Sequence, residues 1–380
     1  MSWALWITGP PGSGKTARAR AAAERLEAEG QHVEVLELDE MRKLVTPKPT
    51  YGDVERALVY RALVWVAKSM AAAGLPVIID ATAHRREWRD LARLAITAFA
   101  EVQLMCPLPV RREREQRRMP GNAPPEIYAR AGRPGARVPG MDVEYEEALA
   151  PELTLDTATE DVAGAADRIV ALARTLGSAA AARDASAPRW AVWITGLPGS
   201  GKTTLAWRVA EALCARGIGV QVLDLAEARL FVGDAGDRTG LADEIVHRAL
   251  VYAARRLTEA GVPVIVDATA PRREWRELAR AAIRRFAEVQ LVWPAEICAT
   301  RERAARWRLG GVAGIRPSPP SAAAPDVVVG YEPSLRPDLT IHTDVEDEWT
   351  AGETVLLLAR RLHRACLETT ETGWDRADHA

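Results

Sequence analysis

Short apolar runs alternate with longer amphipathic stretches through the first half of the chain. Each run has the length of a buried strand, and the runs lie at 4–7, 33–38, 76–79, 102–105 and 153–155. Helical patterns lie between them, at about 15–29, 54–73, 86–99 and 162–176. Strands separated by helices predict an α/β fold, with a parallel sheet that carries helices on both faces.

The same pattern returns in the second half of the chain. The segment GLPVIIDATAHRREWRDLARLAITAFAEVQLMCP, at 74–107, matches GVPVIVDATAPRREWRELARAAIRRFAEVQLVWP, at 261–294, at most positions. Such self-similarity predicts two fused copies of one domain. We place the first domain at 1–177, an Ala/Ser-rich linker at 178–189, the second domain at 190–368 and a tail at 369–380.

A glycine-rich turn follows the first predicted strand of each copy. The stretches are WALWITGPPGSGKT, ending at Thr16, and WAVWITGLPGSGKT, ending at Thr203. Both contain G-x-x-x-x-G-K-[ST], the phosphate-binding P-loop, between a strand and a helix. Its glycines allow backbone N–H groups to wrap phosphates, its lysine contacts the outer phosphates, and its threonine hydroxyl can ligate Mg²⁺.

A chance match to a glycine-rich turn is the alternative for one copy, and its recurrence in the same context argues against it. The pattern therefore predicts two P-loop domains that bind ATP and Mg²⁺. The expected nucleotide-binding residues are Gly9, Gly12, Ser13, Gly14, Lys15, Thr16, Gly196, Gly199, Ser200, Gly201, Lys202 and Thr203.

Two carboxylates follow predicted strands beside the first loop. Asp80 ends the run VIID and is expected to reach Mg²⁺ together with Thr16, although a strand-end Asp can also cap the next turn. Asp39 follows VLEL and could orient or deprotonate an attacking hydroxyl, with Arg42 holding a substrate anion. The alternative is a helix-capping Asp39 with an exposed Arg42. Ala226 replaces Asp39 in the second copy, which predicts impaired phosphoryl transfer there.

Composition narrows the class of partner. The chain has 48% hydrophobic and 27% charged residues and a net charge of −2, so it lacks a basic field for nucleic acid. The four cysteines form no C-x-x-C pair, which is typical of reduced cytoplasmic proteins. We expect a cytoplasmic protein with a small anionic substrate and no membrane partner, because no apolar run has transmembrane length.

Several further motifs resemble the adenylylsulfate (APS) kinase family, over residues 3–157. LELDEMR, with Asp39 and Arg42, stands where that family reads L-D-G-D-N-x-R. Tyr51-x-x-x-Glu55-Arg56 with Arg61, and Arg114-Glu115, also match it. The resemblance implies an ATP-dependent kinase that phosphorylates the 3′-hydroxyl of adenosine 5′-phosphosulfate.

The same resemblance implies a role for each matching side chain. Lys15, Asp39 and Arg42 would be catalytic, with Asp39 as base or orienter. Arg42, Arg56 and Arg61 would hold the substrate, and Tyr51 would stack on its adenine. Arg114 would lie near the ATP adenine. Because the family is commonly dimeric, the second copy is expected to act as a fused pseudo-dimer partner, with further self-association left open.

The chain also departs from the family pattern. Leu58-Val59-Tyr60 replaces the segment with a substrate-contacting asparagine, Thr82-Ala83-His84 replaces I-S-P, and Val138-Pro139 lies where a second adenine-stacking ring is expected. Two alternatives therefore stay open. One is a P-loop kinase for another hydroxyl, on a nucleotide, a sugar or a natural-product intermediate, and the other is a non-catalytic nucleotide-binding module.

Overall fold

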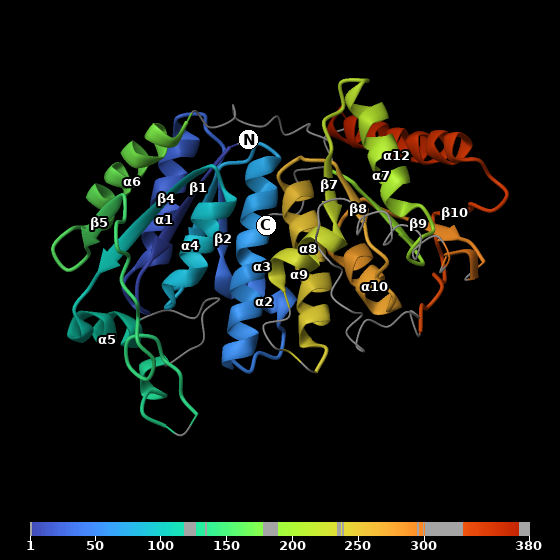
Figure 1. Ribbon diagram of the computed structural model, residues 1–380. Helices are drawn as coiled ribbons and strands as arrows, with labels where there is room; N and C mark the ends of the chain where they lie inside the picture. Colours follow the sequence, from blue (N-terminus) through green and yellow to red (C-terminus); the bar gives the residue numbers. More distant parts are fainter. Residues whose placement is uncertain are drawn as a thin grey trace, which may run out of the picture. The chain divides into compact units, whose positions relative to one another are not determined.

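The protein is represented by a computed structural model, shown in Figure 1. It describes residues 2–117, 127–133, 135–177, 189–233, 237, 239–294, 296–298, 300 and 330–371. The chain divides into two compact units, one of residues 1–183 with 228–253 and the other of residues 184–227 with 254–380. The first unit therefore takes one segment from the second repeat. Each unit contains one five-stranded sheet.

The sheet of the first unit is parallel throughout, as predicted. Its strands are β1 (Trp3–Thr8), β2 (Glu34–Glu37), β3 (Val77–Asp80), β4 (Ala98–Met105) and β5 (Leu153–Asp156). Their order across the sheet is β2-β3-β1-β4-β5. All carboxyl ends of parallel strands meet at one edge, where ligands of such sheets bind. The loops that follow β1, β2, β3 and β4 therefore converge there.

Helices cover both faces of this sheet. They are α1 (Lys15–Ala28), α2 (Leu38–Val45), α3 (Asp53–Ala72), α4 (Arg86–Ala95), α5 (Leu108–Gln116) and α6 (Val162–Leu176), with a 3-10 turn, η1 (Ile127–Ala129). Trp3, Leu5 and Ile7 of β1 share a buried cluster with apolar residues of α1 and α6. Side chains alternate along a strand, so Ala4 and Trp6 face the opposite layer, where α3 and α4 pack against each other.

Two element boundaries differ from the sequence prediction. The run read as a strand to Leu38 ends at Glu37, and α2 begins at once, so Asp39 lies in the first turn of a helix instead of at a strand end. The helix predicted to reach Phe99 ends at Ala95, because Ile96 is already extended, and Phe99 belongs to β4.

The sheet of the second unit has the same order of equivalent strands. Its strands are β6 (Ala191–Gly196), β7 (Gln221–Asp224), β8 (Val264–Asp267), β9 (Phe286–Val292) and β10 (Leu339–His342), ordered β7-β8-β6-β9-β10 and all parallel. The helices of the second repeat are α7 (Lys202–Cys214), α8 (Leu225–Val232), α9 (Leu241–Glu259), α10 (Arg273–Ala282) and α12 (Glu348–Glu371). The repeat thus keeps its fold together with its sequence.

The outer segments complete the description. Residues 178–188 of the predicted linker and 372–380 of the predicted tail lie outside the described residues. Helix α12 continues to Glu371, past the predicted start of that tail. Within the part of the chain that the structure describes, every helix is too short or too polar to cross a bilayer.

Candidate active site

The loop between β1 and α1 forms a cradle that only glycine can build. Gly12 and Gly14 have φ angles of 73° and 85°, in the left-handed region. A Cβ on Gly12 would lie 2.6 Å from the Arg111 carbonyl oxygen, and one on Gly9 would lie 2.8 Å from the Ser13 hydroxyl. The loop therefore keeps its backbone bare at the N-terminus of α1, where N–H groups and the helix dipole favour an anion.

Three polar side chains border this cradle. Lys15 donates from Nζ to the carbonyl oxygens of Gly9 (3.1 Å) and Pro10 (3.3 Å). The Ser13 Oγ is buried and has no hydrogen-bond partner among the described residues. The Thr16 Oγ1 donates to Asp80 Oδ2 at 2.5 Å. A phosphate oxygen could accept hydrogen bonds from both the unpartnered Ser13 hydroxyl and the Lys15 ammonium group, which otherwise bonds only to carbonyl oxygens.

Burial sets the electrostatics of the site. It raises the pKa of Asp80 to about 6, with smaller contributions from Glu37 and Asp39, while Lys15 and Thr16 act in the opposite direction. Desolvation lowers the pKa of Lys15, which Asp80 and Asp39 oppose. A divalent cation would favour the ionised form of Asp80.

Thr16 and Asp80 suit Mg²⁺, since both offer oxygen and Mg²⁺ normally completes its shell with water and phosphate oxygens. No group of three or more His, Cys, Asp or Glu side chains that could hold a metal occurs among the described residues. A site of this kind would therefore depend on the phosphates of the nucleotide.

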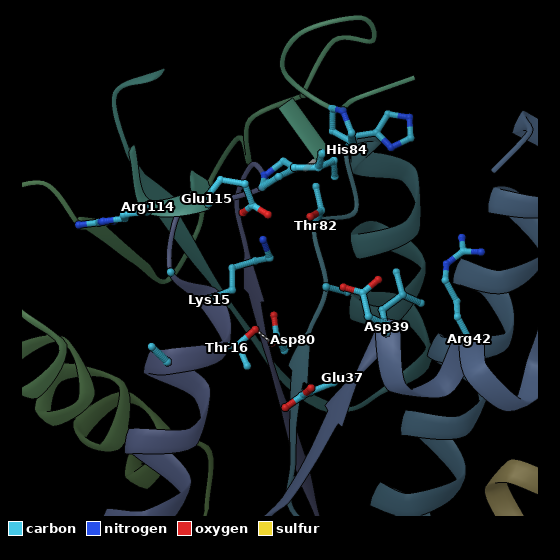
Figure 2. A pocket seen from close by; sticks show the side chains of 18 of the residues that line it. Lys15, Thr16, Glu37, Asp39, Arg42, Asp80, Thr82, His84, Arg114 and Glu115 are labelled. Atoms are coloured by element: carbon cyan, nitrogen blue, oxygen red, sulfur yellow. Dashed lines mark hydrogen bonds between the residues drawn. The ribbon is translucent and has the colours of Figure 1, made fainter. Parts of the chain in front are cut away.

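A cavity of about 600 Å³ joins the cradle to α2 and α3. Lys15, Thr16, Asp39 and Asp80 all line it, and Figure 2 shows the Asp39 carboxylate on the side of the cavity opposite Lys15. Asp39 is thus brought to the nucleotide cradle, as predicted, by the first turn of α2. A carboxylate there can face a hydroxyl placed between it and a bound phosphate.

Arg42 lines the same cavity but is held from within the protein. Its Nη1 donates to Glu55 Oε1 at 2.8 Å, and both side chains are buried. Its guanidinium also lies over the Tyr51 ring, 5.0 Å from the centroid. Glu55 in turn accepts from the backbone N–H and the hydroxyl of Thr50. Glu55 therefore balances the charge of Arg42 and fixes the turn that carries Tyr51, a role that the sequence analysis did not assign.

The remaining predicted arginines separate into two groups. Arg56 and Arg114 line the cavity. Arg114 donates to the Thr157 hydroxyl and carbonyl oxygens, at 3.0 and 2.5 Å. Arg61 is not among the lining residues, and its Nη1 instead donates to the Val232 carbonyl oxygen at 3.3 Å. The structure therefore gives no support to Arg61 as a substrate ligand.

Tyr60 and His84 also line the cavity, although neither was predicted to be a site residue from the sequence. Tyr60 is on α3, one helical turn after Arg56, and His84 follows β3. The sequence could have pointed to both residues, because each lies in a segment that departs from the family pattern.

The second repeat keeps the cradle but not the carboxylate. Gly199 and Gly201 have φ angles of 79° and 93°, and the Ser200 hydroxyl is again buried without a partner among the described residues. Thr203 Oγ1 donates to Asp267 Oδ2 at 2.5 Å, and Lys202 Nζ donates to the Leu197 carbonyl oxygen at 2.9 Å. At the position equivalent to Asp39, Ala226 can neither orient nor accept a proton.

Comparison with known proteins agrees with this geometry. A family model described as adenylylsulphate kinase matches residues 1–156 and 189–317. A probable adenylyl-sulfate kinase of Archaeoglobus fulgidus is 36% identical over 162 residues, which cover 42% of this chain and 99% of that protein. An adenylyl-sulfate kinase of Bacillus pumilus is 35% identical over 158 residues, 40% of this chain and 75% of that protein.

A solved structure of the Mycobacterium tuberculosis APS kinase CysC in complex with AMPPNP and APS is similar at 29% identity, with a TM-score of 0.35. The match covers 45% of this chain and 98% of that chain. The family assignment comes from the sequence matches. Because the family model matches both repeats and well over half of the chain, the protein belongs to the adenylylsulphate kinase family.

Proposed function

We propose that the first repeat transfers the γ-phosphoryl group of MgATP to a hydroxyl of a small anionic acceptor, with adenylyl sulfate as the leading candidate. One observation carries the proposal: Asp39 lines the same cavity as Lys15, Thr16 and Asp80. A phosphate cradle and a candidate hydroxyl-orienting carboxylate thus share one space. The relatives named above, which match the first repeat's length, are adenylyl-sulfate kinases, and this supports the choice of acceptor.

Each group has a distinct task in this proposal. The backbone of Gly9–Gly14 and the Ser13 hydroxyl bind phosphate oxygens, and Lys15 contacts the outer phosphates. Thr16 and Asp80 would hold Mg²⁺, which would neutralise negative charge on the phosphates of the nucleotide. Asp39 orients the acceptor hydroxyl and can take its proton. Arg56 binds the acceptor anion, Arg114 lies near the nucleotide base, and Arg42 with Tyr51 forms the wall beside them.

The second repeat has a supporting task in the same proposal. Its cradle is retained, so it binds a nucleotide, but Ala226 leaves it without a hydroxyl-orienting group. It would act as a fused pseudo-dimer partner, which is consistent with a first compact unit that includes residues 228–253. We place the protein in the cytoplasm, where its four free cysteines would stay reduced.

The test is acceptor-dependent release of ADP by the full chain, with adenylyl sulfate as acceptor and Asp39→Asn as variant. Asparagine keeps the shape of the side chain but cannot take a proton, so kcat is expected to fall by about 100-fold or more. The ATP-induced rise in melting temperature should remain, because the cradle is unchanged. Equal turnover of variant and wild type would refute the role of Asp39. ATP binding without acceptor-dependent turnover would favour a nucleotide-binding module instead.

A further inference from the structure

Three polar side chains outside the phosphate cradle line the same cavity. Arg56 and Tyr60 are one turn apart on α3, so they share a face of that helix, and His84 follows β3. All three line the cavity and all three are at least nine-tenths buried, with exposed fractions of 8%, 4% and 5%. Figure 2 shows His84 above Thr82, on the side away from Thr16 and Asp80. We call Arg56, Tyr60 and His84 the polar wall.

The polar wall is held rigidly by its neighbours. Tyr60 stacks on Trp88, with ring centroids 4.1 Å apart, and His84 meets the same indole edge-on at 5.0 Å. The N–H of Ala83 donates to the Tyr60 hydroxyl at 2.9 Å, and the His84 carbonyl oxygen accepts from Glu146 N–H at 2.8 Å. These contacts fix where the wall presents its donors.

Each member of the wall keeps unused hydrogen-bonding capacity. Arg56 Nη2 donates to the Arg137 carbonyl oxygen at 2.7 Å, but its buried Nη1 has no partner among the described residues. The Tyr60 oxygen accepts from Ala83, and this leaves its O–H free to donate into the cavity. No hydrogen bond to the His84 ring occurs in the described part of the chain. Buried donors without partners cost free energy, so a ligand that accepts from them gains affinity.

Burial, together with nearby charges, keeps the ring of His84 neutral. Burial lowers the pKa of His84 to about 4, and the cations Arg56 and Arg85 add to this, while the anions Asp53 and Glu146 oppose it. Near neutral pH the imidazole therefore carries one N–H and no charge. The wall then offers one positive charge and three donors, a set that fits an oxyanion with no hydrogen to donate.

The second repeat has lost this wall. Asp243, His247 and Pro271 stand at the positions of Arg56, Tyr60 and His84. Asp243 reverses the charge, and Pro271 offers no side-chain hydrogen bond. All three wall residues differ between the repeats, whereas the two phosphate cradles differ only where Leu197 replaces Pro10. The polar wall therefore occurs only in the repeat that has the Asp39 carboxylate, whereas the fold is common to both repeats.

We infer that Tyr60 and His84 are specificity residues that, together with Arg56, bind an oxyanion of the acceptor, a sulfate or fully ionised phosphate ester. This inference rests on the proposed function, because it assigns the wall to the acceptor of the same site. Sulfate and phosphate monoester groups share the required chemistry, since both present several acceptor oxygens and negative charge.

The test measures equilibrium binding of four probes to the full chain without ATP: adenylyl sulfate, AMP, adenosine and inorganic sulfate. The variants are Tyr60→Phe, His84→Ala and His84→Gln, and the control is Arg85→Gln, an exposed neighbour that does not line the cavity. We expect Tyr60→Phe and His84→Ala to weaken the anionic probes on the order of 10- to 100-fold and to leave adenosine unchanged. His84→Gln should restore most of the affinity because its amide donates, and Arg85→Gln should match wild type.

Steady-state kinetics with adenylyl sulfate gives the second readout. A specificity role raises the KM of the acceptor and leaves the KM of ATP unchanged. Tighter binding of adenylyl sulfate than of AMP identifies a sulfate wall, and the reverse identifies a phosphate wall. Equal losses for adenosine and the anions would overturn the inference, as would binding of none of the probes. Absence of phosphoryl transfer with probe binding intact would instead refute only the proposed function.

Discussion

The two repeats keep one scaffold and differ in the chemistry placed on it. Both have a five-stranded parallel sheet in the same order, glycines with positive φ in the loop, and a threonine hydroxyl bonded to the aspartate that ends the next strand. Only the first has a carboxylate at Asp39 and the polar wall, where the second has Ala226, Asp243, His247 and Pro271. The proposed nucleotide contacts thus come from the strand and helix ends that both repeats share, whereas the proposed acceptor contacts come from a few side chains that differ between the repeats without loss of the fold.

The largest expected difference between the repeats is the effect on kcat/KM of replacing the lysine of each P-loop. Lys15→Ala should lower kcat/KM by about 1,000-fold, because the charge that stabilises the transferring phosphoryl group is lost. Lys202→Ala should change it by less than about threefold, because its repeat transfers nothing. Calorimetric titration should show that each variant loses one of two nucleotide sites. Equal losses of turnover would contradict the proposed division of labour.

A buried ion pair tests the shared scaffold. Arg89 Nε lies 2.6 Å from Glu101 Oε1, and Arg276 Nε lies 2.8 Å from Glu288 Oε1, all four side chains being buried. Replacement of either arginine by alanine removes the nearest counter-ion of a buried carboxylate and leaves only Arg93, 3.8 Å from Glu101, or Arg280, 3.2 Å from Glu288. Each replacement should therefore cost about 3 kcal/mol of unfolding free energy. Denaturant titration of Arg89→Ala and Arg276→Ala checks this. A cost confined to one repeat would show that the scaffolds are not equivalent.

The histidine of the polar wall should make stability depend on pH in a way that Pro271 cannot. Because the pKa of His84 is lowered to about 4, the unfolded state takes up a proton first as the pH falls. The stability that comes from the neutral ring is therefore complete above pH 6.5 and lost by about pH 4, and it amounts to roughly 3 kcal/mol. Between pH 6.5 and about pH 4, the unfolding free energy of the His84→Gln variant should therefore fall by that much less than the unfolding free energy of wild type. Parallel stability curves for variant and wild type would show that the ring is not neutral in the folded protein.

The smallest expected effect is a change in the unfolding free energy of the nucleotide-free protein when a buried aspartate, Asp80 or Asp267, is replaced. Burial raises the pKa of both Asp80 and Asp267, so their ionised forms destabilise the unliganded fold at neutral pH. Asp80→Asn should raise the unfolding free energy by about 1 kcal/mol, and Asp267→Asn should change it in the same direction. Each should also remove the extra thermal stability that Mg²⁺ with nucleotide gives its own repeat. Thermal melts with and without MgATP measure both effects, and a lower melting temperature without ligand would disprove the first.

The sequence was sufficient to predict the nucleotide cradle and the parallel sheets, because both depend on local patterns. A P-loop needs glycine, lysine and threonine at fixed spacing, and a buried strand needs a short apolar run. Helix α2 was missed because it begins one residue after a strand, with no glycine or proline between, and is stabilised by burial of Met41 and Val45. The pairing of Arg42 with Glu55 depends on how α2 and α3 pack, and the position of Arg61 depends on a contact with Val232, far away in the sequence. Spacing along the chain encodes neither.

Both repeats contain an alanine with a positive φ angle directly after the residue that follows the third strand's aspartate and alanine. Ala83 and Ala270 have φ angles of 40° and 39°, a conformation that costs an alanine about 1 kcal/mol. Each carbonyl oxygen accepts from the arginine of its buried ion pair, Arg89 or Arg276. The same unfavourable turn with the same arginine contact occurs in both repeats, so it belongs to the scaffold that they share. His84 and Pro271 follow this turn directly, so the residue after it differs between the repeats while the backbone before it stays the same.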